Sequence, residues 1–116
     1  MVMFDSARRH IVEQRDFLIE EFIRRARSIY PAWDKYSKDR IWVEWGGALK
    51  YLNQIDETFH LEGVQNPIGD KFWSNLKTIA DILFKDKKEK LTKEEKEIIK
   101  AEVEIMISAV QNCHTK

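Results

Sequence analysis

The sequence predicts an all-α protein, a single-domain four-helix bundle whose helices run antiparallel in an up-down-up-down order. Apolar residues recur at intervals of three and four along four segments, which is the periodicity of helices with one buried face. No segment shows the strict alternation of a half-buried strand. Short connections favour antiparallel neighbours. The expected helices occupy residues 6–30, 39–62, 67–85 and 93–113 of one domain spanning 1–116.

The first expected helix, residues 6–30, ends before Pro31, because proline disfavours helical geometry in the residue that precedes it. Arg15 interrupts the apolar stripe of this helix. Its aliphatic stem can pack in the core while its guanidinium reaches outward. Alternatively, it pairs with an acid such as Asp56 or Glu102, and such a pair typically fixes the register of a bundle.

The second expected helix, residues 39–62, has the most regular pattern. Its apolar positions follow one another at intervals of 4, 3, 4, 3 and 4, which is the a/d pattern of a packed helix seam. They are Ile41, Trp45, Ala48, Leu52, Ile55 and Phe59. Gly63 is a natural residue to end this helix in the left-handed conformation.

Capping signals place the starts of the last two helices. Asn66 is the expected N-cap of residues 67–85, with Pro67 at the first helical position. Thr92 and Glu95 have the spacing of a capping box at the start of residues 93–113.

The C-terminal half of the last expected helix is apolar on nearly every side, in the segment Ile105–Val110. A helix that is apolar all round is expected to be buried all round. It needs three neighbours within the fold, or one neighbour from a second copy of the chain. The sequence therefore predicts a homodimer that forms through the last expected helix.

Composition and motifs argue against several functional classes. The 116 residues carry 20 basic and 20 acidic side chains, so the chain lacks the overall positive charge typical of non-specific nucleic-acid binding. A single cysteine, Cys113, allows no internal disulfide, and the apolar runs are too short to span a membrane. No nucleophile elbow, phosphate-binding loop or zinc-protease motif occurs. We expect a cytoplasmic, non-enzymatic protein without metal or cofactor.

Two adjacent glycines, Gly46 and Gly47, lie inside the second expected helix and follow two tryptophans. Each costs about 1 kcal/mol relative to alanine in a helix interior. One explanation is close packing against a neighbouring helix or an aromatic ring, and another is that the helix begins after Gly47. The functional explanation is a docking face for a protein partner, because tryptophan is enriched at the energetic centres of interfaces. Its residues are Trp42, Gly46, Gly47 and Trp33.

A basic stretch surrounds the first expected connection. Residues 24–40 contain six cations and only two acids, Asp34 and Asp39, so these 17 residues carry a net charge of +4. The cations are Arg24, Arg25, Arg27, Lys35, Lys38 and Arg40. Tyr30, Trp33 and Tyr36 lie between them, where they can stack on bases or close the end of the bundle.

Two functional hypotheses follow from these patterns. The first is a non-catalytic helical module that binds a protein partner, as an inhibitor, an immunity-type protein or an accessory subunit of a larger complex. The alternative is a small helical subunit that binds a nucleic acid or a nucleotide through the basic stretch.

Overall fold

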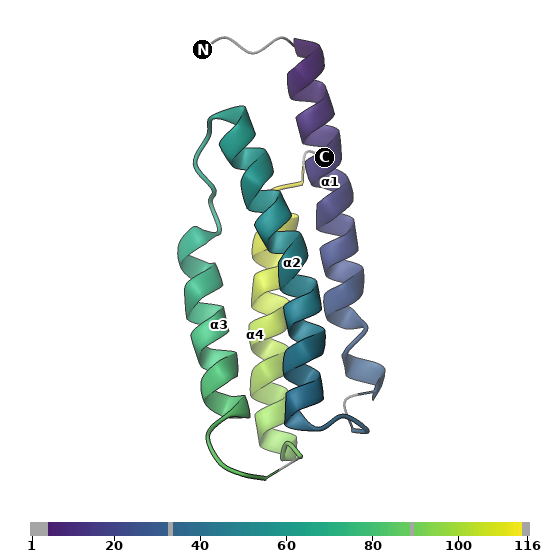
Figure 1. Cartoon of the computed structure of the whole chain (residues 1–116), viewed down its shortest axis with the longest axis vertical. Helices are drawn as coiled ribbons and strands as arrows, with labels where there is room; N and C mark the ends of the chain where they lie inside the picture. The colour runs from purple at the N-terminus through teal and green to yellow at the C-terminus, as the bar shows by residue number, and fades with distance from the viewer. Residues whose placement is uncertain (1–4, 33, 89, 115–116) are drawn as a thin grey trace.

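The computed structural model describes residues 5–32, 34–88 and 90–114 (Figure 1). Within these residues the chain forms four α-helices, one short 3-10 helix and no strand, which confirms the predicted all-α fold. The helices are α1 (Asp5–Arg27), α2 (Lys38–Glu62), α3 (Gly69–Leu83) and α4 (Lys93–Gln111), and the 3-10 helix η1 covers Tyr30–Ala32.

Contacts between helices show how the chain alternates in direction. Arg15, in the first half of α1, contacts Glu62 at the end of α2, whereas Arg25 near the end of α1 contacts Glu44 near the start of α2. Figure 1 shows α3 and α4 continuing this alternation. The bundle is elongated, about 53 Å long and 24 by 19 Å across. One end therefore carries both the α1–α2 and the α3–α4 connections.

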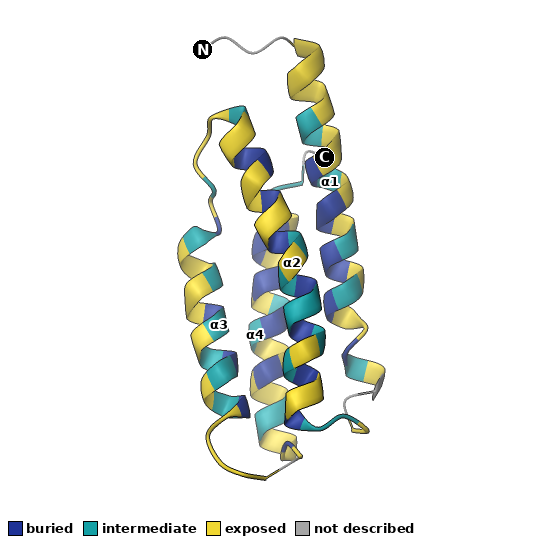
Figure 2. Ribbon diagram, in the orientation of Figure 1, coloured by how far each residue is buried: buried dark blue, intermediate teal, exposed yellow. Residues whose placement is uncertain are grey.

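The predicted stripe of α2 is the centre of the core (Figure 2). All six of its apolar positions are at most 7% exposed. Ser37 caps the helix by accepting a hydrogen bond from the backbone N–H of Arg40 at 3.2 Å. Gly63 ends the helix with a positive φ of 78°, as the sequence predicts. The helix runs straight through Gly46 and Gly47, so the alternative start after Gly47 is wrong.

Six of the eight predicted helix ends differ from the structure by one to three residues. The helix α1 ends at Arg27, three residues before the predicted end, and the turn of η1 follows. The helix α3 begins at Gly69, two residues later than predicted. Asn66 accepts a hydrogen bond from the N–H of Ile68 at 3.0 Å and donates one to Asp56 at 2.7 Å. Its side chain therefore closes a turn that precedes the helix.

The helix α4 begins with the predicted capping box of Thr92 and Glu95. The expectation that its second half is buried on all sides is wrong, because Ile105 is 55% exposed. Ile98, two turns earlier on the same face, is 49% exposed. The helix packs on α1 and α3, and its outer face has no neighbour among the described residues.

Arg15 is buried, only 6% exposed, as its place on the apolar stripe implies. Its guanidinium donates to the hydroxyl of Thr58 at 2.9 Å, forms an ion pair with Glu62 and lies 3.8 Å from the ring centre of Phe59. The predicted partners Asp56 and Glu102 are wrong. Glu62 follows Phe59 by three residues and so continues the stripe of α2.

Candidate functional site

The six cations predicted as an anion site lie at the end that carries both connections, but acids hold most of them. Arg24 pairs with Glu21, Arg27 with Glu104, and both Arg25 and Arg40 with Glu44. Lys38 is 4% exposed and pairs with Asp86 at 2.8 Å. Among the six, only Lys35 is exposed and has no carboxylate partner among the described residues. The cations lie close together, yet most of their charge is compensated.

The aromatic residues of the basic stretch close the end of the bundle. The hydroxyl of Tyr30 donates to Glu104 at 2.7 Å, and burial followed by this hydrogen bond raises the pKa of Tyr30. The guanidinium of Arg40 lies 5.2 Å from the ring centre of Tyr36. Both rings are partly buried. Trp33 lies outside the described residues.

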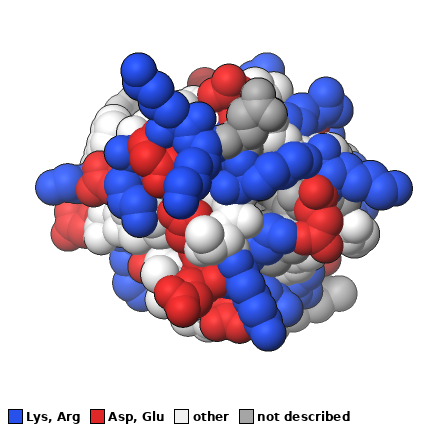
Figure 3. All heavy atoms as spheres, turned by 90° about the horizontal axis from the view of Figure 1, so that it is seen from below, with Lys and Arg blue, Asp and Glu red and all other residues white. Residues whose placement is uncertain are grey.

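The fold adds a second basic segment that the sequence analysis did not place here. Lys90, in the α3–α4 connection, donates to the backbone carbonyls of Asp34 and Tyr36 at 3.3 and 3.4 Å. Together with the pair formed by Lys38 and Asp86, these bonds bring residues 84–93 against residues 24–40. Figure 3 looks onto this end, where blue side chains predominate.

The ion pair at this end predicts a specific pH dependence. The ammonium of Lys38, followed by the backbone N–H of Lys88, lowers the pKa of Asp86 below 3.8. Because the folded pKa is the lower one, the pair stabilises the fold above about pH 4 and loses this effect as the pH falls through the folded pKa. We expect Asp86→Asn to be less stable than the wild type at about pH 7, with the difference shrinking towards about pH 3.

Urea unfolding at both pH values measures this difference, with Asp81→Asn as the matched control. Asp81 is an exposed acid on α3 without an ion-pair partner among the described residues. If the difference in free energy of unfolding between Asp86→Asn and the wild type stays constant with pH, the carboxylate charge does not contribute to stability.

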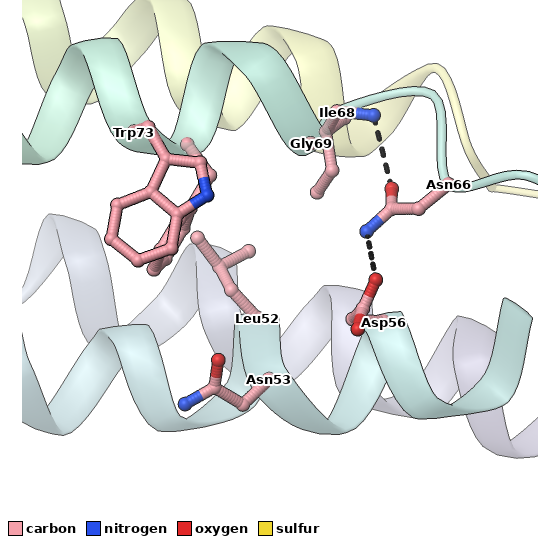
Figure 4. Close-up of a pocket in the computed structure, with 8 residues that line it drawn as sticks. Leu52, Asn53, Asp56, Asn66, Ile68, Gly69 and Trp73 are labelled. Carbon is pink, nitrogen blue, oxygen red and sulfur yellow. Dashed lines mark hydrogen bonds between the residues drawn. The ribbon is translucent and has the colours of Figure 1, made fainter. Parts of the chain in front are cut away.

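A second surface lies along the seam between α2 and α3, which pack on each other much less extensively than α1 and α2 do. A cavity of about 150 Å³ opens in this seam (Figure 4). Its lining comes from both helices and from the turn between them: Leu52, Asn53, Asp56, Asn66, Ile68, Gly69, Phe72 and Trp73. Leu52 and Ile68 provide an apolar floor, and the hydrogen-bonded Asp56 and Asn66 close one side.

Exposed aromatic rings mark both ends of the seam. Trp73 stands at the cavity with 68% of its surface exposed, and its ring packs edge-on against Phe72 at 5.2 Å. At the other end, the partly buried ring of Trp42 meets Phe84 edge-on at 5.3 Å. Phe84 is itself 53% exposed. The seam thus presents apolar surface over much of its length.

Gly47 has a reason within the fold. A Cβ atom at this position would lie 2.8 Å from a guanidinium nitrogen of Arg25. That guanidinium pairs with Glu44 at 3.1 Å across the α1–α2 interface. Close packing therefore explains Gly47, and the neighbour is an arginine of α1 rather than an aromatic ring.

Gly46 has no such reason. A Cβ atom built there meets no atom within 4 Å. Gly46 follows Trp42 by four residues and precedes Leu49 by three, so the three residues share one face of α2. The same face continues to Asn53, which lines the cavity. The destabilisation of about 1 kcal/mol that a helical glycine causes is therefore not offset by any described contact.

The two glycines should respond differently to alanine. Gly46→Ala is expected to stabilise the protein by about 0.5–1 kcal/mol, because the methyl group enters open space in a helical backbone. Gly47→Ala should gain less, because the methyl group displaces the guanidinium of Arg25. Chemical denaturation of both variants measures the difference. Equal gains would mean that Arg25 moves aside without cost.

The structure thus separates the residues predicted for partner binding. It brings Trp42 and Gly46 together at the α2–α3 seam, turns Gly47 towards α1, and leaves Trp33 outside the described residues. The sequence analysis missed Trp73 and Phe84 as parts of this surface. Both lie beside the buried face of α3, and their spacing of eleven residues, about three turns, could have revealed them.

No group of three or more metal-ligating side chains occurs among the residues described. None of the described helices has the length and apolar character needed to cross a lipid bilayer. Comparison with protein-family models, curated proteins and solved structures found no match.

Proposed function

We propose that this protein is a non-catalytic binding module that docks a helix of a partner protein in the α2–α3 seam. The observation that carries the proposal is Gly46, a helical glycine that no contact within the described fold requires. Glycine allows close approach of another backbone. In this seam the approaching backbone would be that of the partner.

The cavity defines what the partner must present. A cavity of about 150 Å³, with an apolar floor and polar residues on one side, is large enough for a benzene-sized group. A phenylalanine or leucine side chain of the partner would fill it, with the exposed ring of Trp73 packing against that side chain. Tryptophan at the edge of such a pocket is typical of the residues that contribute most to binding energy.

The length of the seam defines the partner segment. Trp42 and Leu52 are ten residues apart on α2, which is about 15 Å. A partner helix of about three turns covers this distance, with apolar residues at positions i, i+3, i+4 and i+7 facing the seam. Docking of this kind suits an inhibitor, an immunity-type protein or an accessory subunit.

Trp73→Ala tests the proposal, with Phe17→Ala as the matched control. Both side chains are exposed aromatics, at 68% and 58%, but Phe17 lies on α1 away from the seam. The tagged chain carries a photo-cross-linker at Asn53, on the rim of the cavity, and is irradiated in an extract of the source cells. We expect one protein to be cross-linked by the wild type and by Phe17→Ala but not by Trp73→Ala.

Circular dichroism verifies that all three proteins are folded. Cross-linked peptides of the partner should map to one amphipathic helix. Equal cross-linking by Trp73→Ala and the wild type, or a cross-linked segment without helical apolar spacing, would contradict docking in the seam.

A second copy of the chain is a further partner that we propose, on a different face. Ile98 and Ile105 are exposed at 49% and 55% and lie two turns apart on the outer face of α4. Light scattering at high micromolar concentration tests this contact. A dimer that becomes a monomer in Ile105→Glu supports it, and a monomeric wild type rejects it.

A further inference from the structure

The charge of this protein is unevenly distributed along its sequence. Residues 24–40 carry six cations and two acids, and residues 84–93 carry five lysines and two acids. The two segments have net charges of +4 and +3, or +7 together, and the end that they form is here called the basic end. Four acids from outside the two segments pair with cations within them: Glu21, Glu44, Glu95 and Glu104. Because the whole chain is neutral, the remaining residues carry −7. Two segments therefore hold an excess of cations, although the composition of the whole chain is neutral.

The basic end is one surface made from two distant parts of the sequence. Lys90 bonds to the carbonyls on both sides of Lys35, at Asp34 and Tyr36. Asp86, which pairs with Lys38 of the other segment, lies next to Lys87 in the chain. These contacts place Lys35 and Lys87 at the same end of the bundle.

The two segments differ in how much of their charge is available. The arginines of the first segment and Lys38 are held by acids, as described above. Within the two segments, Lys90 is held by backbone carbonyls, and four further exposed lysines form no ion pair and no side-chain hydrogen bond among the described residues: Lys35, Lys87, Lys88 and Lys93. The paired side chains form a rigid base, and these four lysines carry the charge that a ligand can meet.

We propose that the basic end binds the phosphate backbone of duplex nucleic acid without sequence selectivity. Lysine is a flexible point charge that matches a phosphate, and contacts to phosphates carry no sequence information. Tyr30 and Tyr36, the tyrosines of the basic end, are engaged in the fold and offer no stacking platform for single-stranded bases. A protein-protein interface needs an apolar centre. The described residues of the basic end expose one large apolar side chain, Phe84, and its ring lies at the edge of this end against Trp42 of the seam. Binding to a row of phosphates requires only the positive charge of the exposed lysines.

The number of free lysines sets the expected strength and salt dependence. Four contacts to phosphates give a slope of log K against log salt of about −3.5 for duplex DNA. Affinity should then fall about a hundred-fold between about 50 and 200 mM salt. Dissociation constants of about 10⁻⁴ to 10⁻⁶ M are typical for binding of this kind.

Two variants with the same net charge test the proposal. Lys35, Lys87 and Lys88 are replaced by glutamine in the first, and Lys50, Lys71 and Lys77 in the second. The second set consists of exposed lysines on α2 and α3, away from the basic end and without ion pairs in the described structure. Fluorescence anisotropy is measured with a short labelled DNA duplex, its single strand and polyglutamate, each at two salt concentrations.

We expect the wild type to bind the duplex with the slope given above. The first variant should lose at least about tenfold in affinity and its slope should shrink to about −1, because one phosphate contact remains. The second variant should stay within about threefold of the wild type. Equal losses in both variants would reduce the effect to net charge and overturn the proposal.

Three further results would also overturn it. The first is no binding of the wild type to the duplex at low salt. The second is tighter binding to polyglutamate than to the duplex, which would indicate an acidic protein as the partner. The third is tighter binding to the single strand than to the duplex. Because the exposed lysines lie outside the α2–α3 seam, failure here leaves the proposed helix docking untouched, and loss of helix docking in Trp73→Ala leaves nucleic-acid binding intact.

Discussion

Replacing Trp45 with alanine is expected to lower the free energy of unfolding by about 3–5 kcal/mol. Trp45 is 1% exposed, and its ring lies 6.0 Å from that of Phe22 across the α1–α2 interface. Alanine would leave a cavity at the most extensively packed interface of the bundle. A domain has a total stability of about 5–15 kcal/mol, so this one change removes a large part of it.

Trp73→Ala is the matched control, because the same atoms are removed from a side chain that is 68% exposed. It should cost less than about 1 kcal/mol, mostly through the lost edge-on contact with Phe72. Trp45→Phe should cost less than Trp45→Ala, because phenylalanine keeps an aromatic ring in the core and leaves a smaller cavity. Both variants remove an indole N–H that has no hydrogen-bond partner among the described residues. Urea denaturation measures all three. Similar costs for Trp45→Ala and Trp73→Ala would contradict the described core.

The sequence predicts the core of α2 well because its evidence is local. Each buried apolar position of α2 follows the previous one by three or four residues, and Gly63, which ends the helix, lies directly after it. Such signals need no knowledge of the other helices. The same reasoning predicts the capping box of α4.

Predictions that depend on neighbouring helices were less successful. The composition of Ile105–Val110 implies burial on every side, but only two helices flank α4, so Ile105 remains exposed. The basic stretch could be read from the sequence, whereas its meeting with residues 84–93 could not, because that requires the lengths and directions of all four helices. For the same reason, the ion pairs that neutralise the arginines were not predicted.

The partner of Arg15 shows how far a sequence pattern can be extended. Arg15 interrupts the stripe of α1, and Glu62 is the next position on the stripe of α2 after Phe59. In an antiparallel hairpin, the start of one helix lies beside the end of the next. The two interruptions therefore meet, and this matching of positions along the axis favours Glu62 over Asp56.

Removing Arg15 should be the second most destabilising of these changes, because it leaves a carboxylate without its partner. The side chains of Arg15 and Glu62 are 7% and 15% exposed. Loss of one partner of a buried pair costs about 3–5 kcal/mol, and the remaining exposure of Glu62 places Arg15→Met near the lower limit. Methionine retains part of the apolar stem, so the measured loss in urea denaturation reflects mainly the guanidinium and its bonds to Thr58.

A double-mutant cycle with Glu62→Gln separates the pair from the packing. In Arg15→Met the carboxylate of Glu62 is unpaired, and Glu62→Gln removes that charge. The double variant should therefore lose less free energy of unfolding than the sum of the two single losses, by about 1 kcal/mol or more. Arg15→Lys should recover only part of the stability, because an ammonium cannot bond to Thr58 and Glu62 in the geometry of a guanidinium while lying flat on Phe59. Additive losses would show that Arg15 stabilises the bundle through its stem alone.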